Sequence, residues 1–188
     1  MLAASIGGPQ VVKEFLAAFE SPVPAIFVLA QHIGAGFIRL LAEQLDQAGV
    51  LNVSIAEEGV RPKPGHVYVA PVDHELGLTP EGRWRLRRRT TTGLYAPNID
   101  QVMQVLAEHF IDRTHAIVFS GMGGDGLEGC RYIHRDGGEI WVQEPHTCVV
   151  SAMVDAVRQQ GLDAFVGSPR QLAQRLAERL REDARKPS

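Results

Sequence analysis

The sequence is poor in the features that mark several common classes of protein. It has two cysteines, Cys130 and Cys148, which form no C-x-x-C arrangement, so neither a disulfide framework nor a thiolate metal site is indicated. Its apolar runs are far shorter than the ~20 residues of a membrane-spanning helix, which argues against membrane insertion. No charged segment followed by an apolar one opens the chain, so we expect a cytoplasmic protein rather than an exported one.

Charge and histidine spacing argue against two further classes. The formal net charge of −3 is unlike that of a nucleic-acid binder. The histidines show no metal-ligand spacing such as H-E-x-x-H, and no metal or other cofactor is implied. What the chain does have is 45% apolar residues among 188, enough for a full core in one domain of ordinary size. We therefore expect a single domain over residues 1–188.

Strand-like and helix-like segments alternate, which predicts an α/β fold with a doubly wound, mostly parallel sheet and helices on both faces. The segments flanking Thr79-Pro80-Glu81-Gly82 predict one antiparallel hairpin. Expected strands lie near 2–4, 25–30, 52–56, 66–70, 115–120 and 139–143, and expected helices near 9–20, 36–48, 99–110, 125–135 and from Pro169 onward. The residues expected to face the core from the second helix are Phe37, Leu40, Leu41 and Leu45.

Polar side chains of three complementary types directly follow three of these strands. Ser5 follows the first strand, His32 follows the strand near 25–30, and Asp125 lies in the glycine-rich loop after the strand near 115–120. Chemistry in an open parallel sheet sits outside the carboxyl ends of the strands. A serine, a histidine and an aspartate collected there suggest a nucleophile, its general base and the group that orients the base.

Each of these residues also has an ordinary structural interpretation. The segment around Ser5 is a near match to the G-x-S-x-G elbow, with Ala3 in place of the first glycine, but a serine before a helix is also a common N-cap. His32 precedes a glycine-rich loop, where a neutral imidazole can accept a proton or simply make a structural hydrogen bond.

The loop that carries Asp125 is also a literal dinucleotide fingerprint. Gly121-x-Gly123-x-x-Gly126 follows an expected strand and opens an expected helix, and Glu144 lies where a ribose-binding acid would fall. Asp125 argues against that interpretation, because its charge would repel a pyrophosphate at the helix N-terminus. The helix dipole would instead keep Asp125 ionised and able to accept a hydrogen bond from an imidazole.

Taken together, the motifs resemble those of the catalytic domain of the bacterial chemotaxis protein-glutamate methylesterases (CheB type). That family has its serine in Ser-Thr-Gly-Gly, its histidine in Gln-His and its aspartate in Gly-Met-Gly-x-Asp-Gly. The matching segments here are Ser5-Ile6-Gly7-Gly8, Gln31-His32 and Gly121-Met122-Gly123-Gly124-Asp125-Gly126. Further similar stretches are Val67-Tyr68-Val69-Ala70-Pro71, Pro97-Asn98-Ile99-Asp100, and Gly137-Gly138 leading to Gln143.

The resemblance implies a role for each of these residues. Ser5 is then the nucleophile, His32 the general base and Asp125 the orienter of His32, while the main-chain amide of Met122 donates to the oxyanion. The family hydrolyses glutamate methyl esters on the cytoplasmic region of chemoreceptors, some members also deamidate glutamine there, and no cofactor is needed. Its members usually carry an N-terminal receiver domain that gates the site, and we expect no receiver domain within these 188 residues. A receiver domain or another regulator is therefore an expected partner.

Four positions in three segments depart from the family pattern. Ile6 replaces the threonine beside the nucleophile and so removes a hydroxyl. Ala152-Met153-Val154 stands where the family usually has Gly-Met-Pro, and Ala96 precedes Pro97 where an arginine is common.

A run of arginines follows the predicted hairpin turn. Arg85, Arg87 and Arg89 alternate as in a strand, which places them on one face with Arg83. Such a strip would bind an acidic helical surface, such as the methylation region of a receptor. The structural alternative is an edge strand protected by charge, and a single strip is weak support for nucleic-acid binding.

The hypothesis is therefore a serine esterase that demethylates chemoreceptor glutamates in a bacterial chemosensory pathway. Two alternatives stay open. One is a catalytically degenerate module that binds a receptor or another signalling partner, and the other is a dinucleotide-binding enzyme.

Overall fold

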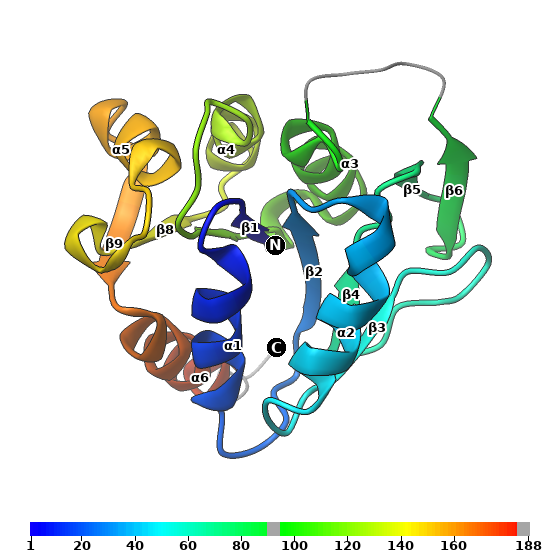
Figure 1. Ribbon diagram of the computed structural model, residues 1–188, viewed down its shortest axis with the longest axis horizontal. Coiled ribbons are helices and arrows are strands. Elements are labelled where there is room, and N and C mark those ends of the chain that lie inside the picture. Colours follow the sequence, from blue (N-terminus) through cyan, green and yellow to red (C-terminus); the bar gives the residue numbers. More distant parts are fainter. Residues whose placement is uncertain (90–94, 184–188) are drawn as a thin grey trace.

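The computed structural model describes residues 1–89 and 95–183, in which helices cover both faces of a parallel sheet (Figure 1). The strands of this sheet, in the order β3-β4-β2-β1-β7-β8-β9, are bounded by Asn52–Ile55, His66–Val69, Ile26–Gln31, Leu2–Ala4, Ala116–Val118, Ile140–Gln143 and Asp163–Gly167. The helices are α1 (Gly8–Ala17), α2 (Ile38–Asp46), α3 (Ile99–Phe110), α4 (Leu127–Arg135), α5 (Ala152–Gln159) and α6 (Pro169–Asp183). Short 3-10 turns are η1 (Ala35–Phe37), η2 (Ile111–Arg113) and η3 (Pro145–Thr147). The predicted doubly wound fold is confirmed.

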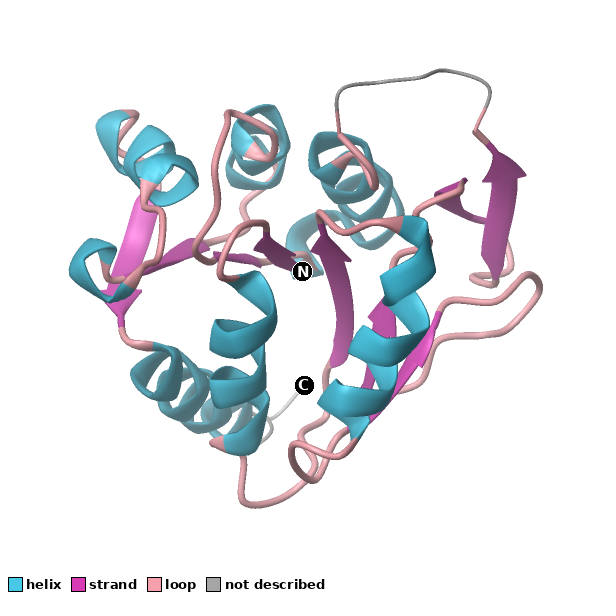
Figure 2. Ribbon diagram, viewed as in Figure 1, coloured by secondary structure: helices cyan, strands magenta, loops and turns pink. Residues whose placement is uncertain are grey.

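Two hydrophobic cores lie on opposite faces of the sheet. Side chains alternate along a strand, so Leu2 and Ala4 enter one core and Ala3 enters the other. The first core is closed by α1, α2 and α6, and the second by α3, α4 and α5 (Figures 1 and 2). Because both faces are covered, β1 and β7 are apolar throughout and β2 is apolar up to Gln31, as expected for a buried parallel sheet.

The predicted inward face of α2 is partly wrong. Phe37 and Leu40 are 63% and 51% exposed, whereas Leu41 and Leu45 are buried as expected. Phe37 belongs to the preceding 3-10 turn, so the helix proper begins at Ile38. Ala42 then completes the inward stripe, and Leu40 falls outside that stripe at 100° per residue.

Two elements near the C-terminus were not predicted. They are helix α5 and edge strand β9, which pairs in parallel with β8. Most residues of β9 are half-buried or exposed, and the pairing contains a register shift beside Ile140, so the strand shows no clean alternation. In the structure, α6 follows β9 and packs against α1 on the same face of the sheet.

The predicted hairpin is present and lies apart from the main sheet. Strands β5 (His74–Leu78) and β6 (Trp84–Arg88) pair antiparallel, and Thr79 and Gly82 close the turn through main-chain hydrogen bonds. Trp84 is fully buried and packs edge-on against Tyr68 of β4. The hairpin therefore attaches to the body of the protein through one apolar face.

The strand order places three loops at one point of the sheet. The chain passes from β1 to β2 on one side, and β7 joins β1 on the other side, so β2, β1 and β7 are neighbours. Ser5 follows β1, His32 follows β2, and the loop with Asp125 follows β7. At this point the strand order of the open α/β sheet reverses, and such folds bind their ligands there. In the described ranges, no helix has the length and apolar character needed to cross a membrane.

Candidate active site

Ser5 occupies a tight turn between β1 and α1. Its N–H donates to the carbonyl of Ser120 at 3.0 Å, and its own carbonyl accepts from the N–H of Gly8 at 2.9 Å. Gly7 has φ of 81°, and a Cβ on this residue would lie 2.7 Å from Cβ of Val149, so only glycine fits. Gly7 is also the N-cap of α1, and no side chain caps that helix, so the interpretation of Ser5 as an N-cap is wrong.

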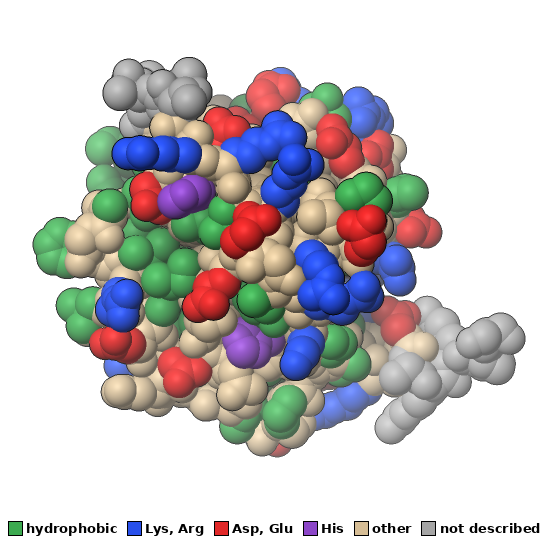
Figure 3. All heavy atoms as spheres, turned by 90° about the vertical axis from the view of Figure 1, so that its right-hand side faces the viewer, with side chains coloured by type: hydrophobic (Ala, Val, Ile, Leu, Met, Phe, Trp, Pro, Cys, Tyr) green, Lys and Arg blue, Asp and Glu red, His purple; other side chains and the backbone are tan. Residues whose placement is uncertain are grey.

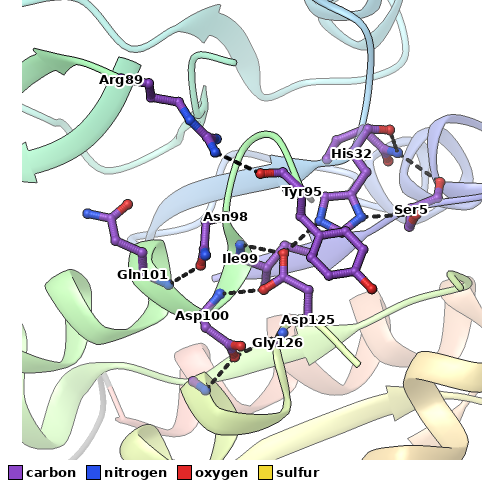
Figure 4. Close-up of polar contacts among 12 residues, drawn as sticks. Ser5, His32, Arg89, Tyr95, Asn98, Ile99, Asp100, Gln101, Asp125 and Gly126 are labelled. Carbon is purple, nitrogen blue, oxygen red and sulfur yellow. Dashed lines mark hydrogen bonds and ion pairs between the residues drawn. The ribbon is translucent and has the colours of Figure 1, made fainter. Parts of the chain in front are cut away.

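The structure brings Ser5, His32 and Asp125 into one hydrogen-bonded chain (Figure 4). Oγ of Ser5 lies 3.1 Å from Nδ1 of His32, and Nε2 of the same ring lies 2.7 Å from Oδ2 of Asp125. The side chains of His32 and Asp125 are 12% and 2% exposed, so the pair is largely screened from water. These distances are short enough for direct proton transfer between Ser5 and His32.

The charge of Asp125 sets the tautomer of His32. Burial disfavours the ionised carboxylate, but hydrogen bonds from His32 and from the amides of Ile99 and Asp100 outweigh burial and lower the pKa of Asp125 below its ordinary value. An ionised carboxylate can only accept, so Nε2 of His32 carries a proton toward it. In the neutral ring Nδ1 is then unprotonated, and its lone pair faces the Ser5 hydroxyl.

The loop that carries Asp125 does not offer a free phosphate site. Amides at the start of α4 that would bind a pyrophosphate, those of Gly126 and Gly129, donate to Oδ1 of Asp100 at 2.9 and 2.7 Å. The helix N-terminus is therefore already paired with a carboxylate of the protein itself. The dinucleotide interpretation of this loop has no support in the structure.

Met122 lies on the loop that carries Asp125, directly after the residue that contacts Ser5. The preceding Gly121 packs against Ser5 so closely that a Cβ there would lie 2.8 Å from Cβ of Ser5. No hydrogen bond joins the N–H of Met122 to any other residue in 1–89 or 95–183. This amide is therefore available to donate to a bound oxygen, while the Met122 side chain is exposed.

Two neighbours of the triad received no role from the sequence. Gln31, which is buried at the end of β2, donates through Nε2 to the carbonyls of both Ser5 and His32. Tyr95 stacks flat on the His32 ring, with centroids 4.9 Å apart and planes 9° from parallel (Figure 4). The Gln-His dipeptide was a usable signal for Gln31, whereas nothing local to Tyr95 indicated its stacking partner.

The predicted arginine strip divides into two parts. Arg85 and Arg87 are exposed on the hairpin and line a cavity of about 300 Å³ together with Glu75, Gln101 and Glu108. Arg89 follows the end of β6, is half-buried, and donates to the carbonyl of Tyr95 at 2.9 Å. Figure 3, which looks onto this side of the molecule, shows basic side chains interspersed with acidic ones. The strip is therefore not a uniform positive surface.

A serine hydroxyl, an imidazole and a buried carboxylate, joined in this order on an α/β sheet, define the serine-hydrolase class of site. A family model described as CheB methylesterase matches residues 1–176. The chain therefore belongs to the CheB methylesterase family.

Individual relatives agree with this assignment. The chain is 37% identical over 180 residues to "Protein-glutamate methylesterase/protein-glutamine glutaminase 4" of Myxococcus xanthus, covering 96% of this chain and 51% of that protein. It is 35% identical over 181 residues to a protein of the same description, numbered 3, from Anaeromyxobacter dehalogenans, covering 96% and 53%. The chain thus spans about half the length of these curated relatives.

A solved structure supports the fold independently. The catalytic domain of Thermotoga maritima CheB methylesterase superposes with a TM-score of 0.89 at 31% identity. The superposition covers 94% of this chain and 95% of that domain. The part of the relatives that this chain matches therefore has the extent of a catalytic domain.

Proposed function

We propose that this chain is a serine esterase that hydrolyses methyl esters of glutamate side chains on the cytoplasmic region of chemoreceptors, and that it works in the cytoplasm. The observation that carries the proposal is the chain of contacts from Ser5 through His32 to Asp125, in a member of the CheB methylesterase family. The names of the relatives add glutamine deamidation as a second reaction of the same site, since both substrates present an acyl carbon to one nucleophile.

The geometry supports a two-step acyl transfer. Oγ of Ser5 attacks the ester carbonyl while Nδ1 of His32 accepts the hydroxyl proton, and the amide of Met122 donates to the developing oxyanion. Asp125 stays ionised and stabilises the imidazolium through Nε2. His32 then returns the proton to the departing methoxide, which releases methanol and leaves a glutamyl ester on Ser5.

Water completes the cycle. His32 takes a proton from a water molecule, the resulting hydroxide attacks the glutamyl ester, and the proton passes to Ser5 as the free glutamate leaves. Throughout the cycle the protein itself supplies the nucleophile, the base and the donors. A receiver domain or another regulator is the proposed control partner, because the relatives are about twice as long as this chain.

Methanol release from a methylated receptor fragment tests the proposal. Ser5→Ala should lower kcat by roughly 10³–10⁶-fold, with Asp125→Asn costing somewhat less. Ser151→Ala is the matched control, because the Ser151 hydroxyl donates a hydrogen bond to Asp155 and lies outside the triad. A fluorophosphonate probe should label Ser5 in the wild type and in the control.

Two outcomes would contradict catalysis. Equal methanol release by the wild type and Ser5→Ala would exclude this serine as the nucleophile. An unlabelled Ser5, together with binding of the receptor fragment without turnover, would favour a degenerate binding module instead.

A further inference from the structure

The first amides of α3 and of α4 each donate to an aspartate that comes from the start of the other helix. Asp125, two residues before α4, accepts from the amides of Ile99 and Asp100 in the first turn of α3, at 2.9 and 3.0 Å. In return, Oδ1 of Asp100 accepts from the amides of Gly126 and Gly129 at the start of α4, at 2.9 and 2.7 Å. Each helix therefore supplies the anion that the N-terminus of the other favours (Figure 4).

We propose that Asp100 is a positioning residue for the His32–Asp125 pair, a role that rests on the proposed function. The two carboxylates differ in what they contact. Asp125 reaches the imidazole of His32 directly, whereas the Asp100 carboxylate accepts from the main chain that follows Asp125. Burial, together with the nearby charge of Asp125, raises the pKa of Asp100 above its ordinary value. Asp100 thus acts through the position of Asp125.

The loop around Asp125 needs hydrogen bonds from outside to fix its conformation. It contains glycines on both sides of Asp125, and Gly123 and Gly126 have φ of 95° and 100°, so its backbone has little intrinsic preference for one conformation. The hydrogen bonds to Asp100 hold the residue directly after Asp125 and the first turn of α4. Charge-assisted bonds of this kind are about twice as strong as neutral ones.

The hydrogen bonds from Gly126 and Gly129 to Asp100 are possible because α3 and α4 approach closely. A Cβ on Gly129 would lie 2.6 Å from Cβ of Met103, and one on Gly126 would lie 3.1 Å from Cγ2 of Ile99. Only glycines at these positions allow one aspartate side chain to span from α3 to the amides of α4.

Asp100 is not required to cap its own helix. Oδ1 of Asn98 accepts from the amide of Gln101 at 2.7 Å, which is the ordinary N-cap contact of α3. Asn98 therefore provides a matched control: it stabilises the same helix end, and its side chain has no hydrogen bond to Asp125.

The experiment compares Asp100→Ala, Asp100→Asn and Asn98→Ala by two readouts. The first is kcat and KM for ester hydrolysis, and the second is the far-downfield proton NMR signal of the His32 Nε2–H, assigned by its loss in Asp125→Asn. Asp100→Ala should lower kcat by roughly 10²-fold, the size of effect that a misplacement near 1 Å produces, with KM little changed. Its downfield signal should shift upfield or broaden.

The other variants separate positioning from stability. Asp100→Asn keeps an oxygen acceptor but loses its charge, so we expect an intermediate decrease in kcat and an intermediate shift. Asn98→Ala should lower the Tm and leave kcat and the signal unchanged. An Asp100→Asn protein that equals the wild type in both readouts would overturn the proposal, even if Asp100→Ala does not fold.

The NMR readout does not depend on turnover. If the wild type has no esterase activity but Asp100→Ala displaces the signal and Asn98→Ala does not, the proposed function fails and the positioning role stands. If the wild type is active and both Asp100 variants retain its kcat and its signal, the positioning role fails alone.

Discussion

The carboxamide of Gln31 donates to the carbonyl of Ser5 at 2.8 Å from inside the protein. The same nitrogen donates to the carbonyl of His32 at 3.0 Å, so one side chain holds the main chain of both residues. Gln31 is 2% exposed, and a Cβ on Gly8 would lie 2.0 Å from its Oε1, so the amide is confined on both sides. The separation of the serine and the histidine therefore depends on a residue that binds their main-chain carbonyls.

Gln31→Glu should damage both stability and activity. A carboxylate cannot donate, so the carbonyls of Ser5 and His32 would each lose a partner and face a buried acceptor instead. The Ser5 carbonyl keeps the bond from the amide of Gly8, whereas the His32 carbonyl loses the bond from Gln31, so we expect a loss of about 1–3 kcal/mol in urea unfolding, together with a lower kcat. Gln44→Glu, at an exposed position of α2, is the control and should change neither quantity. Wild-type kcat in Gln31→Glu would show that this contact does not set the geometry of the pair.

Ile6→Thr should make the enzyme faster. Isoleucine and threonine are both β-branched, so the turn should be kept while a hydroxyl is restored beside Ser5. Ile6 is 44% exposed, which leaves room for that hydroxyl to orient the nucleophile or donate to the oxyanion. An oxyanion donor is worth about 10²–10³-fold in kcat, and we expect a gain of roughly tenfold or more in kcat/KM for methanol release.

Val149→Thr provides the control for that gain. It adds the same hydroxyl at the rim of the site, 69% exposed beside Gly7, without placing it next to Ser5. We expect no acceleration from Val149→Thr. A rate for Ile6→Thr no greater than that of the wild type would mean that the family threonine does not act through its hydroxyl here.

Arg85 and Arg87 should contribute to docking rather than to chemistry. Replacing both with glutamate should weaken binding to an acidic receptor fragment and flatten its salt dependence, with turnover of a small ester unchanged. Arg89 is left intact, because it donates to the carbonyl of Tyr95. The same change at the exposed Arg170 and Arg175 of α6 controls for net charge. Equal receptor affinity in the two double variants would reduce the strip to a charged edge.

Asp125 should make unfolding pH-dependent in a defined direction. Its pKa in the folded protein lies below its ordinary value of 3.8, chiefly because its hydrogen bonds outweigh the cost of burial. In the window between these two pKa values the unfolded chain binds more protons than the folded one, so stability rises with pH there. The contribution is fully present above the unfolded pKa and is lost as pH falls through the folded pKa.

Urea unfolding of the wild type and Asp125→Asn at a series of acidic pH values measures this contribution. The difference in unfolding free energy between the two proteins should shrink as the pH is lowered below 3.8. A difference that stays constant, or grows, toward lower pH would show that the carboxylate is not stabilised in its ionised form.

The agreement between sequence and structure is best where the signal is local and strong. The helix expected near 99–110 is α3 with those bounds, because an N-cap asparagine and a regular apolar stripe define it. The face of α2 was misjudged at Phe37, since a 3-10 turn before the helix changes the register in a way that apolar spacing does not show. Strand β9 has no clear alternation of apolar and polar residues, because its side chains are mostly half-buried at the sheet edge.

The sequence by itself determined which reactive residues are present and where they lie along the chain. They are a serine, a histidine and an aspartate, each placed after a predicted strand, and the glycines beside them indicate tight turns. Only the tertiary structure decided that these three strands are neighbours and that Asp125 reaches His32 across 93 residues of sequence. It alone also showed that Gln31 donates to the carbonyl of Ser5 and that Tyr95 stacks on His32. The hydrogen bonds by which Asp100 and Asp125 join α3 to α4 were likewise visible only there. The physical reason is that turn and strand patterns follow from short-range forces, whereas strand order and the approach of two helix ends follow from packing two cores at once.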